Sequence, residues 1–369
     1  MNNRMIGGNV EMVSETCSSV ALVKWEDNAG DIEAAIHCEL TNLGHRAIYF
    51  KYDEAIPAGV DVVFSFAPYR NFLQIPRQLD GMPAKERPIF VHWNTEGLLD
   101  LSIPQWAGMA IGAFRSWVGR LNDSEAHWTQ TLMRYSPLRL INSRMRGSLR
   151  LGDYHYAHRK GWLDVFADIS AVYARRFSEQ GLPTIHAPFG TSPLWYAHLG
   201  LERDIDVLWM GMRGTRRRGK ILDRLEQKLD ARGVRFHMTD GIKNPFVLGE
   251  ARTRLLNRAK ITVNILRTWW SENSLRFALA APNRSLIVSE KILPHSPAYK
   301  PGVHYVSAPV DKLAESILYY LEHEQERLRI VGNAYQLATE EMKFGKSVKI
   351  IMEAVYMTRE SMKAHLGTI

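Results

Sequence analysis

A cluster of basic residues near the middle of the chain has the chemistry to bind an anionic group. It follows a short apolar run, Ile205–Met210, which ends at Gly211. The basic residues are Arg213, Arg216, Arg217, Arg218 and Lys220. No acidic residue stands between Asp206 and Asp223, so we expect nothing nearby to neutralise the cluster. Guanidinium groups and the N–H groups at the start of a helix both bind phosphate.

The order of these residues indicates where such a site would lie. A buried strand, a glycine turn, a cationic loop and an amphipathic helix from Ile221 follow one another. Open α/β sheets bind ligands beyond the carboxyl ends of their strands, and the loop would lie there. The segment therefore predicts a phosphate-binding loop. A solvated basic turn is the alternative.

A second basic segment spans residues 134–160 and contains only one acidic residue, Asp153. Its basic residues are Arg134, Arg139, Arg144, Arg146, Arg150, Arg159 and Lys160. Such a patch suits nucleic acid, an acidic membrane surface or an anionic substrate. Tyr135, Tyr154 and Tyr156 would stack on bases. A solvated loop that serves solubility is the competing interpretation.

Apolar runs alternate with helical patterns along the chain, which is typical of parallel α/β sheets. In the first part we expect strands at Val20–Trp25, Ala47–Phe50, Val60–Phe66, Pro88–Trp93, Leu138–Asn142 and Thr184–Ala187. Helices are expected at Ile32–Leu43 and Asp168–Gln180. The pattern restarts after Pro193, with strands at Ile205–Met210, Val234–Met238, Ile261–Leu266, Leu286–Ser289 and His304–Val306. The helices there are Ile221–Arg232, Gly249–Ala259 and Asp311–His323, and a last one spans Ser347–His365.

This order predicts two tandem Rossmann-like, doubly wound α/β domains that face a cleft, which agrees with the length of 369 residues. We expect a flexible tail over residues 1–19 and an N-terminal domain over 20–190. A C-terminal domain over 191–340 would follow the Pro/Gly-rich hinge at 186–193. The final helix, within 341–369, would cross back to the N-terminal domain.

Composition excludes several classes of protein. Hydrophobic residues make up 46% and charged residues 23%, and no apolar segment is long enough to span a bilayer. The N-terminus lacks the apolar core of a secretion signal, so we expect a cytoplasmic protein. Cys17 and Cys38 have no metal-ligand spacing, so we expect reduced thiols and no bound metal. The loop after the first strand holds one glycine, Gly30, and no G-x-G-x-x-G fingerprint, which argues against a nicotinamide dehydrogenase. No Walker loop occurs either. The segment Asp204-Ile205-Asp206 matches a D-x-D motif. It lies at the amino end of an expected strand, whereas we expect ligands to bind at the carboxyl ends of the strands.

The chain resembles glycosyltransferases of the GT-B fold, especially the CgeB-like branch of the group 1 transferases. The similarity runs from Val20 to the C-terminus and is strongest over residues 180–340. It rests on the segments Leu43–Ala47, Pro188–Gly190, Ile205–Arg218, Leu256–Asn264, Ser274–Phe277, Ala278–Ala281, Leu286–Glu290 and Pro301–Tyr305. The resemblance implies a hexosyltransferase-like enzyme that takes a sugar from a nucleotide-diphosphate sugar without a metal or a further cofactor.

The resemblance also implies a set of residues that bind the donor. Arg218 is the expected phosphate ligand, with Gly211, Arg213 and Lys220 beside it, although Lys220 could equally point to water. Asn264 would bond base or sugar, or cap the turn that follows.

Ser274 and Arg276 match the donor-site segment, and a structural salt bridge is the competing role for Arg276. Glu290 would accept bonds from sugar or ribose hydroxyls, or cap a turn. Relatives carry a Glu just before the segment that corresponds to Ala278–Ala281, and this chain has no acid there.

On the acceptor side, His92 and Glu96 follow an expected strand and would line the cleft. Either would act as a general base on the acceptor hydroxyl in an inverting enzyme. Asp31 is a third candidate, with a helix N-cap as its more ordinary role. Trp93 and Trp106 would form a sugar-stacking face or belong to the core.

The acceptor itself is not identified by the sequence. The basic segment 134–160 favours an anionic acceptor, such as a nucleic acid or a phosphorylated lipid. A non-catalytic nucleotide- or sugar-binding protein of the same fold, and an epimerase acting on a nucleotide-sugar, remain alternatives.

Overall fold

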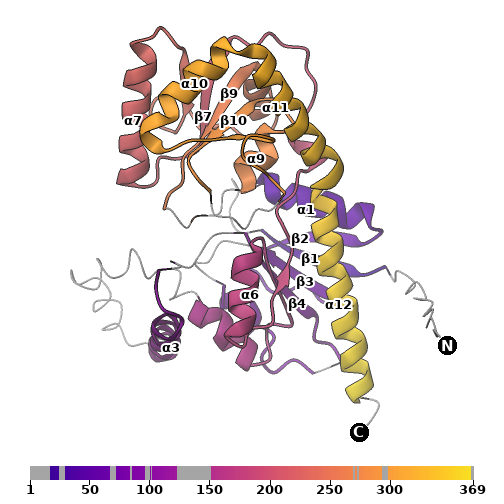
Figure 1. The fold of residues 1–369 in the computed structure, drawn as a ribbon. Helices are drawn as coiled ribbons and strands as arrows, with labels where there is room; N and C mark the ends of the chain where they lie inside the picture. Colours follow the sequence, from indigo (N-terminus) through magenta and orange to yellow (C-terminus); the bar gives the residue numbers. More distant parts are fainter. Residues whose placement is uncertain are drawn as a thin grey trace, which may run out of the picture.

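The computed structural model describes residues 17–24, 30–66, 72–83, 85–95, 100, 102–122, 151–268, 271, 274–292 and 298–366. Two parallel sheets organise this part of the chain, as the sequence predicts (Figure 1). We call residues 17–190 the N-terminal lobe and residues 191–343 the C-terminal lobe. Within the described residues, no helix is long and apolar enough to cross a membrane.

The N-terminal lobe contains a six-stranded sheet with the order β2-β1-β3-β4-β5-β6. Its strands are β1 (Ser19–Lys24), β2 (Arg46–Lys51), β3 (Val62–Phe66), β4 (Ile89–Asn94), β5 (Val165–Asp168) and β6 (Ile185–His186). The helices are α1 (Gly30–Asn42), α2 (Gln74–Arg77), α3 (Gln105–Asn122) and α6 (Ala171–Glu179). The expected strand Leu138–Asn142 lies outside the described residues. Every residue of β3, β4 and β5 is buried, because helices cover both faces of a parallel sheet.

The C-terminal lobe contains a five-stranded sheet with the order β11-β10-β9-β7-β8. Its strands are β7 (Ile205–Met210), β8 (Phe236–Thr239), β9 (Ala259–Asn264), β10 (Leu286–Ser289) and β11 (Val306–Ser307). The helices are α7 (Arg216–Asp230), α8 (Gly249–Arg258), α9 (Ser274–Ala280), α10 (Leu313–Glu322) and α11 (Glu324–Gln336). Short 3-10 turns, Pro193–Trp195 and Val310–Lys312, and a π-helical turn, Leu337–Glu341, complete it.

Helix α7 begins five residues earlier than the apolar periodicity predicts. Thr215 precedes it in extended conformation, and its Oγ accepts a hydrogen bond of 3.2 Å from the N–H of Arg218. A threonine in this position is a strong helix start, because its hydroxyl satisfies one of the free N–H groups. The basic residues from Arg216 to Lys220 therefore form the first turn of the helix, and only Arg213 of the cluster stays in the loop.

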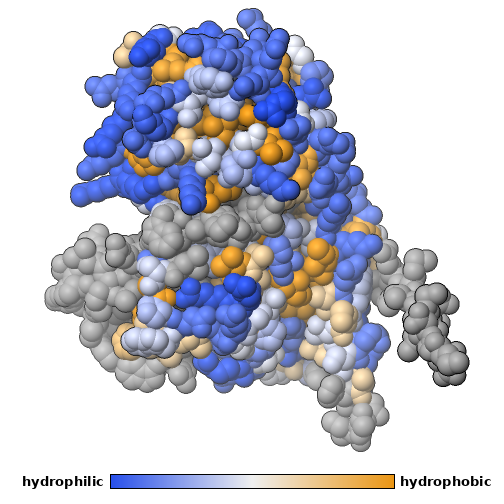
Figure 2. All heavy atoms as spheres, viewed as in Figure 1, coloured by the Kyte–Doolittle hydropathy of each residue, from blue (hydrophilic) through white to orange (hydrophobic). Residues whose placement is uncertain are grey.

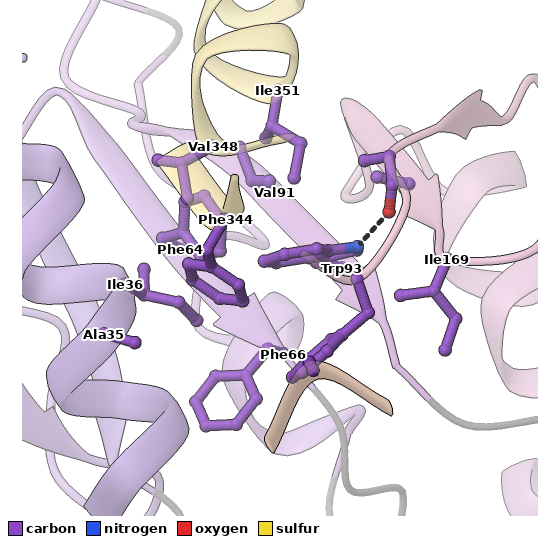
Figure 3. Close-up of a cluster of buried hydrophobic side chains, with 14 of the residues drawn as sticks. Ala35, Ile36, Phe64, Phe66, Val91, Trp93, Ile169, Phe344, Val348 and Ile351 are labelled. Carbon is purple, nitrogen blue, oxygen red and sulfur yellow. Dashed lines mark hydrogen bonds between the residues drawn. The ribbon is translucent and has the colours of Figure 1, made fainter. Parts of the chain in front are cut away.

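The last helix, α12 (Phe344–Leu366), packs on the N-terminal lobe along α1, β4 and β5 (Figure 1). Its residues Phe344, Val348 and Ile351 lie against the core of that lobe (Figure 3). The Phe344 ring lies 5.1 Å from the Trp93 ring, and the Trp93 Nε1 donates a hydrogen bond of 3.1 Å to the carbonyl of Ala187. The chain thus leaves the N-terminal lobe at the hinge and returns to complete it.

The outgoing and returning segments lie side by side where they pass between the lobes. The N–H of Thr191 donates to the carbonyl of Met342 at 2.7 Å, and the N–H of Phe344 donates to the carbonyl of Thr191 at 3.0 Å. One continuous apolar core extends from the first sheet through Trp195 to the near face of the second sheet. A separate core lies on the other face of the second sheet.

Candidate functional site

The carboxyl ends of β7, β9 and β10 meet at one edge of the second sheet. There the loop 211–215 leaves β7 with Gly211 at φ +122° and Gly214 at φ +68°, two conformations that favour glycine. A Cβ on Gly211 would lie 2.9 Å from Nη2 of Arg276, so another residue here would have to displace the guanidinium group. The loop is therefore shaped around an arginine that comes from another element.

Arg276 reaches this edge from α9. Its Nε donates to the carbonyl of Met210 at 3.0 Å, its Nη1 donates to Oδ1 of Asn264 at 2.9 Å, and its guanidinium lies 4.1 Å from the centre of the Trp209 ring. Burial lowers the pKa of Arg276 well below its ordinary value, and the charges of Arg218 and Arg267 lower it further. The contributions of Arg218 and Arg267 place both of these side chains near Arg276.

Arg218 and Arg267 complete this group. Arg218 is buried in the first turn of α7, donates to the carbonyl of Met212 at 3.2 Å and lies 5.4 Å from the Trp209 ring centre. Arg267 follows β9 and is exposed. A Cβ on Gly214 would lie 3.7 Å from Nε of Arg267 and 3.8 Å from Nη1 of Arg218. We call Arg218, Arg267 and Arg276 the arginine triad.

Two other arginines of the basic cluster are neutralised, so the expectation of an unpaired cluster is wrong. Arg213 forms an ion pair with Asp223 and donates from Nε to Asp240 at 2.7 Å. Arg217 forms an ion pair with Glu290. The acids come from α7, from the end of β8 and from the end of β10, which the fold brings to the loop although the sequence separates them.

Three of the expected donor-binding residues hold the site together in this structure. Asn264 is fully buried, donates from Nδ2 to Ser289 Oγ at 2.9 Å and accepts from Arg276. Glu290 accepts from the N–H of Leu266 at 2.5 Å as well as from Arg217. Arg213 is held by Asp223 and Asp240. These contacts connect the ends of neighbouring strands and position the triad.

Lys220 and Ser274 are the remaining donor-binding candidates. Lys220 is exposed on α7. Ser274 is the first residue of α9, and its side chain lies outside the described residues. On the face seen in Figure 2, hydrophilic side chains cover the region of α7.

Sequence reasoning missed Arg267 and the role of Trp209 as the ring between Arg218 and Arg276. Arg267 carried the same signal as the basic cluster, since it is a basic residue directly after an apolar run that ends at the ligand edge. Trp209 carried no such signal, because an aromatic residue in a buried strand is ordinarily core.

On the opposite lobe, His92 does not line a cleft, and that expectation is wrong. Its ring is fully buried, with Ser65 Oγ at 3.0 Å and the Tyr154 hydroxyl at 3.2 Å. Burial lowers the pKa of His92 to about 3. Because β4 is a central strand covered on both faces, both His92 and Trp93 belong to the core.

The remaining acceptor-side candidates differ in their placement. Glu96 lies outside the described residues. Trp106 is 77% exposed on α3, whereas Trp93 is fully buried, so the two do not form one stacking face. Asp31 is the second residue of α1 and pairs with Arg252 of the C-terminal lobe.

The basic segment 134–160 is described only from residue 151. Arg159 and Lys160 are exposed, and the other five basic residues lie outside the described residues. Tyr154 is buried in the core and so offers no face for a base, whereas Tyr156 is half-buried with its ring 5.6 Å from the Trp162 ring. Tyr135 lies outside the described residues. Among the residues that the structure describes, no group of three or more His, Cys, Asp or Glu side chains is arranged to hold a metal.

The comparison with protein families matches the part of the chain that carries the arginine triad. Residues 217–353 match a family model described as glycosyl transferase-like. Most of the C-terminal lobe, together with the start of α12, is therefore glycosyl transferase-like. No curated protein matches the chain.

Solved structures with the same arrangement include glycosyltransferases. Anabaena HepE in complex with UDP and glucose has a TM-score of 0.56 at 12% identity, over 92% of this chain and 100% of that chain. Sucrose-phosphate synthase from Thermosynechococcus elongatus has a TM-score of 0.54 at 12% identity, over 94% and 100%. A glycosyltransferase from Rickettsia africae has a TM-score of 0.56 at 10% identity, over 93% and 99%. These similarities confirm the predicted GT-B fold class.

Proposed function

We propose that this protein is a glycosyltransferase of the CgeB-like branch, which transfers a sugar from a nucleotide-diphosphate sugar to a hydroxyl acceptor. The observation that carries the proposal is the arginine triad at the carboxyl end of β7, next to the start of α7. The glycosyl transferase-like match and the GT-B neighbours support the same reaction class.

The chemistry of transfer explains why such a triad is useful. When the glycosidic bond to the donor breaks, the nucleoside diphosphate leaves with its negative charge. Groups that are held in place before the reaction stabilise this charge best, because they need no reorganisation. Arg276 is held by Met210 and Asn264, and Arg218 is held by the start of α7 and by Met212. We propose that they do this without a metal, with Arg267 at the exposed side.

The proposed division of labour follows the two lobes. Residues 191–340 would bind the donor and residues 20–190 the acceptor, with residues 341–369 crossing back. Glu96 remains our candidate for a general base, and the acceptor hydroxyl remains of unknown class. UDP is the first nucleotide to test, because HepE is seen with UDP and with UDP-glucose. We propose a cytoplasmic location, consistent with the free thiols of Cys17 and Cys38.

The test is thermal melting with UDP, GDP, ADP and their sugar conjugates. A nucleotide at 100 times its dissociation constant should stabilise the fold by about 2.7 kcal/mol. Arg218→Ala should abolish this shift. Arg224→Ala is the matched control, because Arg224 lies exposed on the same helix, and it should keep the shift.

A nucleotide that binds should then be tested for turnover. Release of the free nucleoside diphosphate from its sugar conjugate, with a sugar or lipid acceptor, would complete the case for a transferase. If no nucleotide shifts the melting point, or if Arg224→Ala removes the shift as Arg218→Ala does, the triad is not a donor site. Binding without any turnover would favour a non-catalytic nucleotide-sugar-binding protein.

A further inference from the structure

Asp31 of the N-terminal lobe contacts the C-terminal lobe at three points. Its Oδ2 accepts a hydrogen bond from Nη1 of Arg252 at 2.5 Å and one from the N–H of Gly249 at 3.3 Å. Its backbone carbonyl accepts from Nε1 of Trp195 at 3.2 Å. Asp31 lies at the start of α1, directly beyond the carboxyl end of β1, so this contact is made at the ligand edge of the first sheet.

Arg252 depends on this carboxylate. It is 5% exposed, and its Nε and Nη2 have no hydrogen-bond partner in the described part of the chain. Burial lowers the pKa of Arg252, and the charge of Asp31 opposes that shift. A buried charge that loses its partner is strongly unfavourable, so separation of the two side chains would require Arg252 to find water or another anion.

The start of α8 adds to the attraction. Gly249 is the first residue of this ten-residue helix, and its N–H points to the Asp31 carboxylate. A helix N-terminus and a nearby arginine form a favourable environment for an anion. In this structure the anion is a side chain of the other lobe.

Apart from the chain crossings, few polar contacts join the lobes. Among the described residues, Asp31–Arg252 is the only ion pair between a residue of the N-terminal lobe and one of the C-terminal lobe. We propose that Asp31 and Arg252 form an interlobe latch, a pair of positioning residues that fixes the orientation of α1 against α8 and so sets the opening between the lobes.

The test compares Asp31→Asn, Arg252→Gln and the double variant with the wild type, by hydrogen exchange and small-angle X-ray scattering. We expect faster exchange at the first turn of α8 and a broader distribution of interlobe distances in each single variant. The double variant should show no larger effect than Arg252→Gln alone, because both changes remove the same contact. Arg252→Lys keeps the charge and should recover part of the protection.

Arg254→Gln is the matched control. Arg254 lies on α8 and pairs at 3.7 Å with Glu250 of the same helix, where both side chains are exposed. This variant should behave as the wild type. If it changes exchange and scattering as much as Arg252→Gln does, or if both latch variants match the wild type, the latch does not exist.

Asp31→Asn keeps the shape of the side chain, so it remains informative if Arg252→Gln fails to fold. None of these readouts requires transferase activity, so the latch and the proposed function fail separately. Where turnover is found, loss of the latch should lower kcat or raise the KM for the acceptor, while the nucleotide affinity of the C-terminal lobe stays unchanged.

Discussion

At the scale of single residues, Gly211 leaves room for the guanidinium group of Arg276. Gly211→Ala would place a methyl group within 2.9 Å of Nη2 of Arg276 and would strain a backbone at φ +122°. We expect a loss of stability of more than about 1 kcal/mol and weaker nucleotide binding. Gly241→Ala is the matched control, because Gly241 has φ +77° with open space around its Cβ position. It should lose stability without losing binding, and equal losses of binding in both variants would contradict this role of Gly211.

His92 gives a prediction about pH at the same scale. Burial lowers the pKa of His92 to about 3 from its ordinary value of 6.5, so the unfolded chain binds a proton between these values and the folded chain does not. Its contribution to stability is therefore complete above pH 6.5 and declines as the pH falls toward 3, by up to about 1.4 kcal/mol per pH unit. Urea unfolding at pH 7 and pH 5 should show a smaller difference for His92→Asn than for the wild type. An identical difference would mean that folding does not lower the pKa of His92.

The residue scale also shows how far the sequence predicts the site. The basic cluster and its place after β7 follow from local order, because a glycine that ends an apolar run marks the carboxyl end of a strand. Local order does not reveal the acidic residues that pair with the cluster. Asp240 and Glu290 are 27 and 73 residues away from Arg213 and Arg217, respectively, and only the order of strands in the sheet brings them together.

At the scale of elements, the strands were predictable and the start of α7 was not. Strands buried on both faces are continuous apolar runs, which a sequence displays directly. The start of α7 depends instead on one hydroxyl, that of Thr215, and apolar periodicity cannot reveal it because the first turn is largely polar. The prediction that His92 lines a cleft was wrong for a related reason. A polar residue within an apolar run suggests a functional site, and the sequence alone does not show that helices cover both faces of β4.

The cap of α7 yields a prediction at this scale. Thr215→Ala removes the acceptor for the N–H of Arg218 and should cost about 1 kcal/mol in urea unfolding. Because it loosens the turn that holds Arg218, it should also weaken nucleotide binding. Ser170 caps α6 in the other lobe by accepting from the N–H of Tyr173, so Ser170→Ala should have a similar cost in stability and no effect on binding. Unchanged binding by Thr215→Ala would show that Arg218 does not depend on its helix start.

At the scale of the whole molecule, the lobes share one apolar core, and Phe344 lies at its centre. The Phe344 ring lies 5.1 Å from Trp93, 5.4 Å from Phe189 and 5.2 Å from Trp195. Phe344→Ala should cost about 3–5 kcal/mol and lower the unfolding midpoints of both lobes together, as followed by calorimetry. Met357→Ala, on the same helix but 75% exposed, should change stability by less than about 0.5 kcal/mol. Destabilisation of one lobe alone would show that the lobes unfold independently.

The return of α12 to the first sheet has a consequence for synthesis on the ribosome. Residues 19–186 provide all six strands of that sheet, yet Phe344, Val348 and Ile351, which cover part of its core, are translated after every strand of both sheets. The five-stranded sheet is complete in the nascent chain before those residues emerge. The lobe whose strands are synthesised first is therefore completed last, and part of its apolar surface stays exposed until α12 has been synthesised.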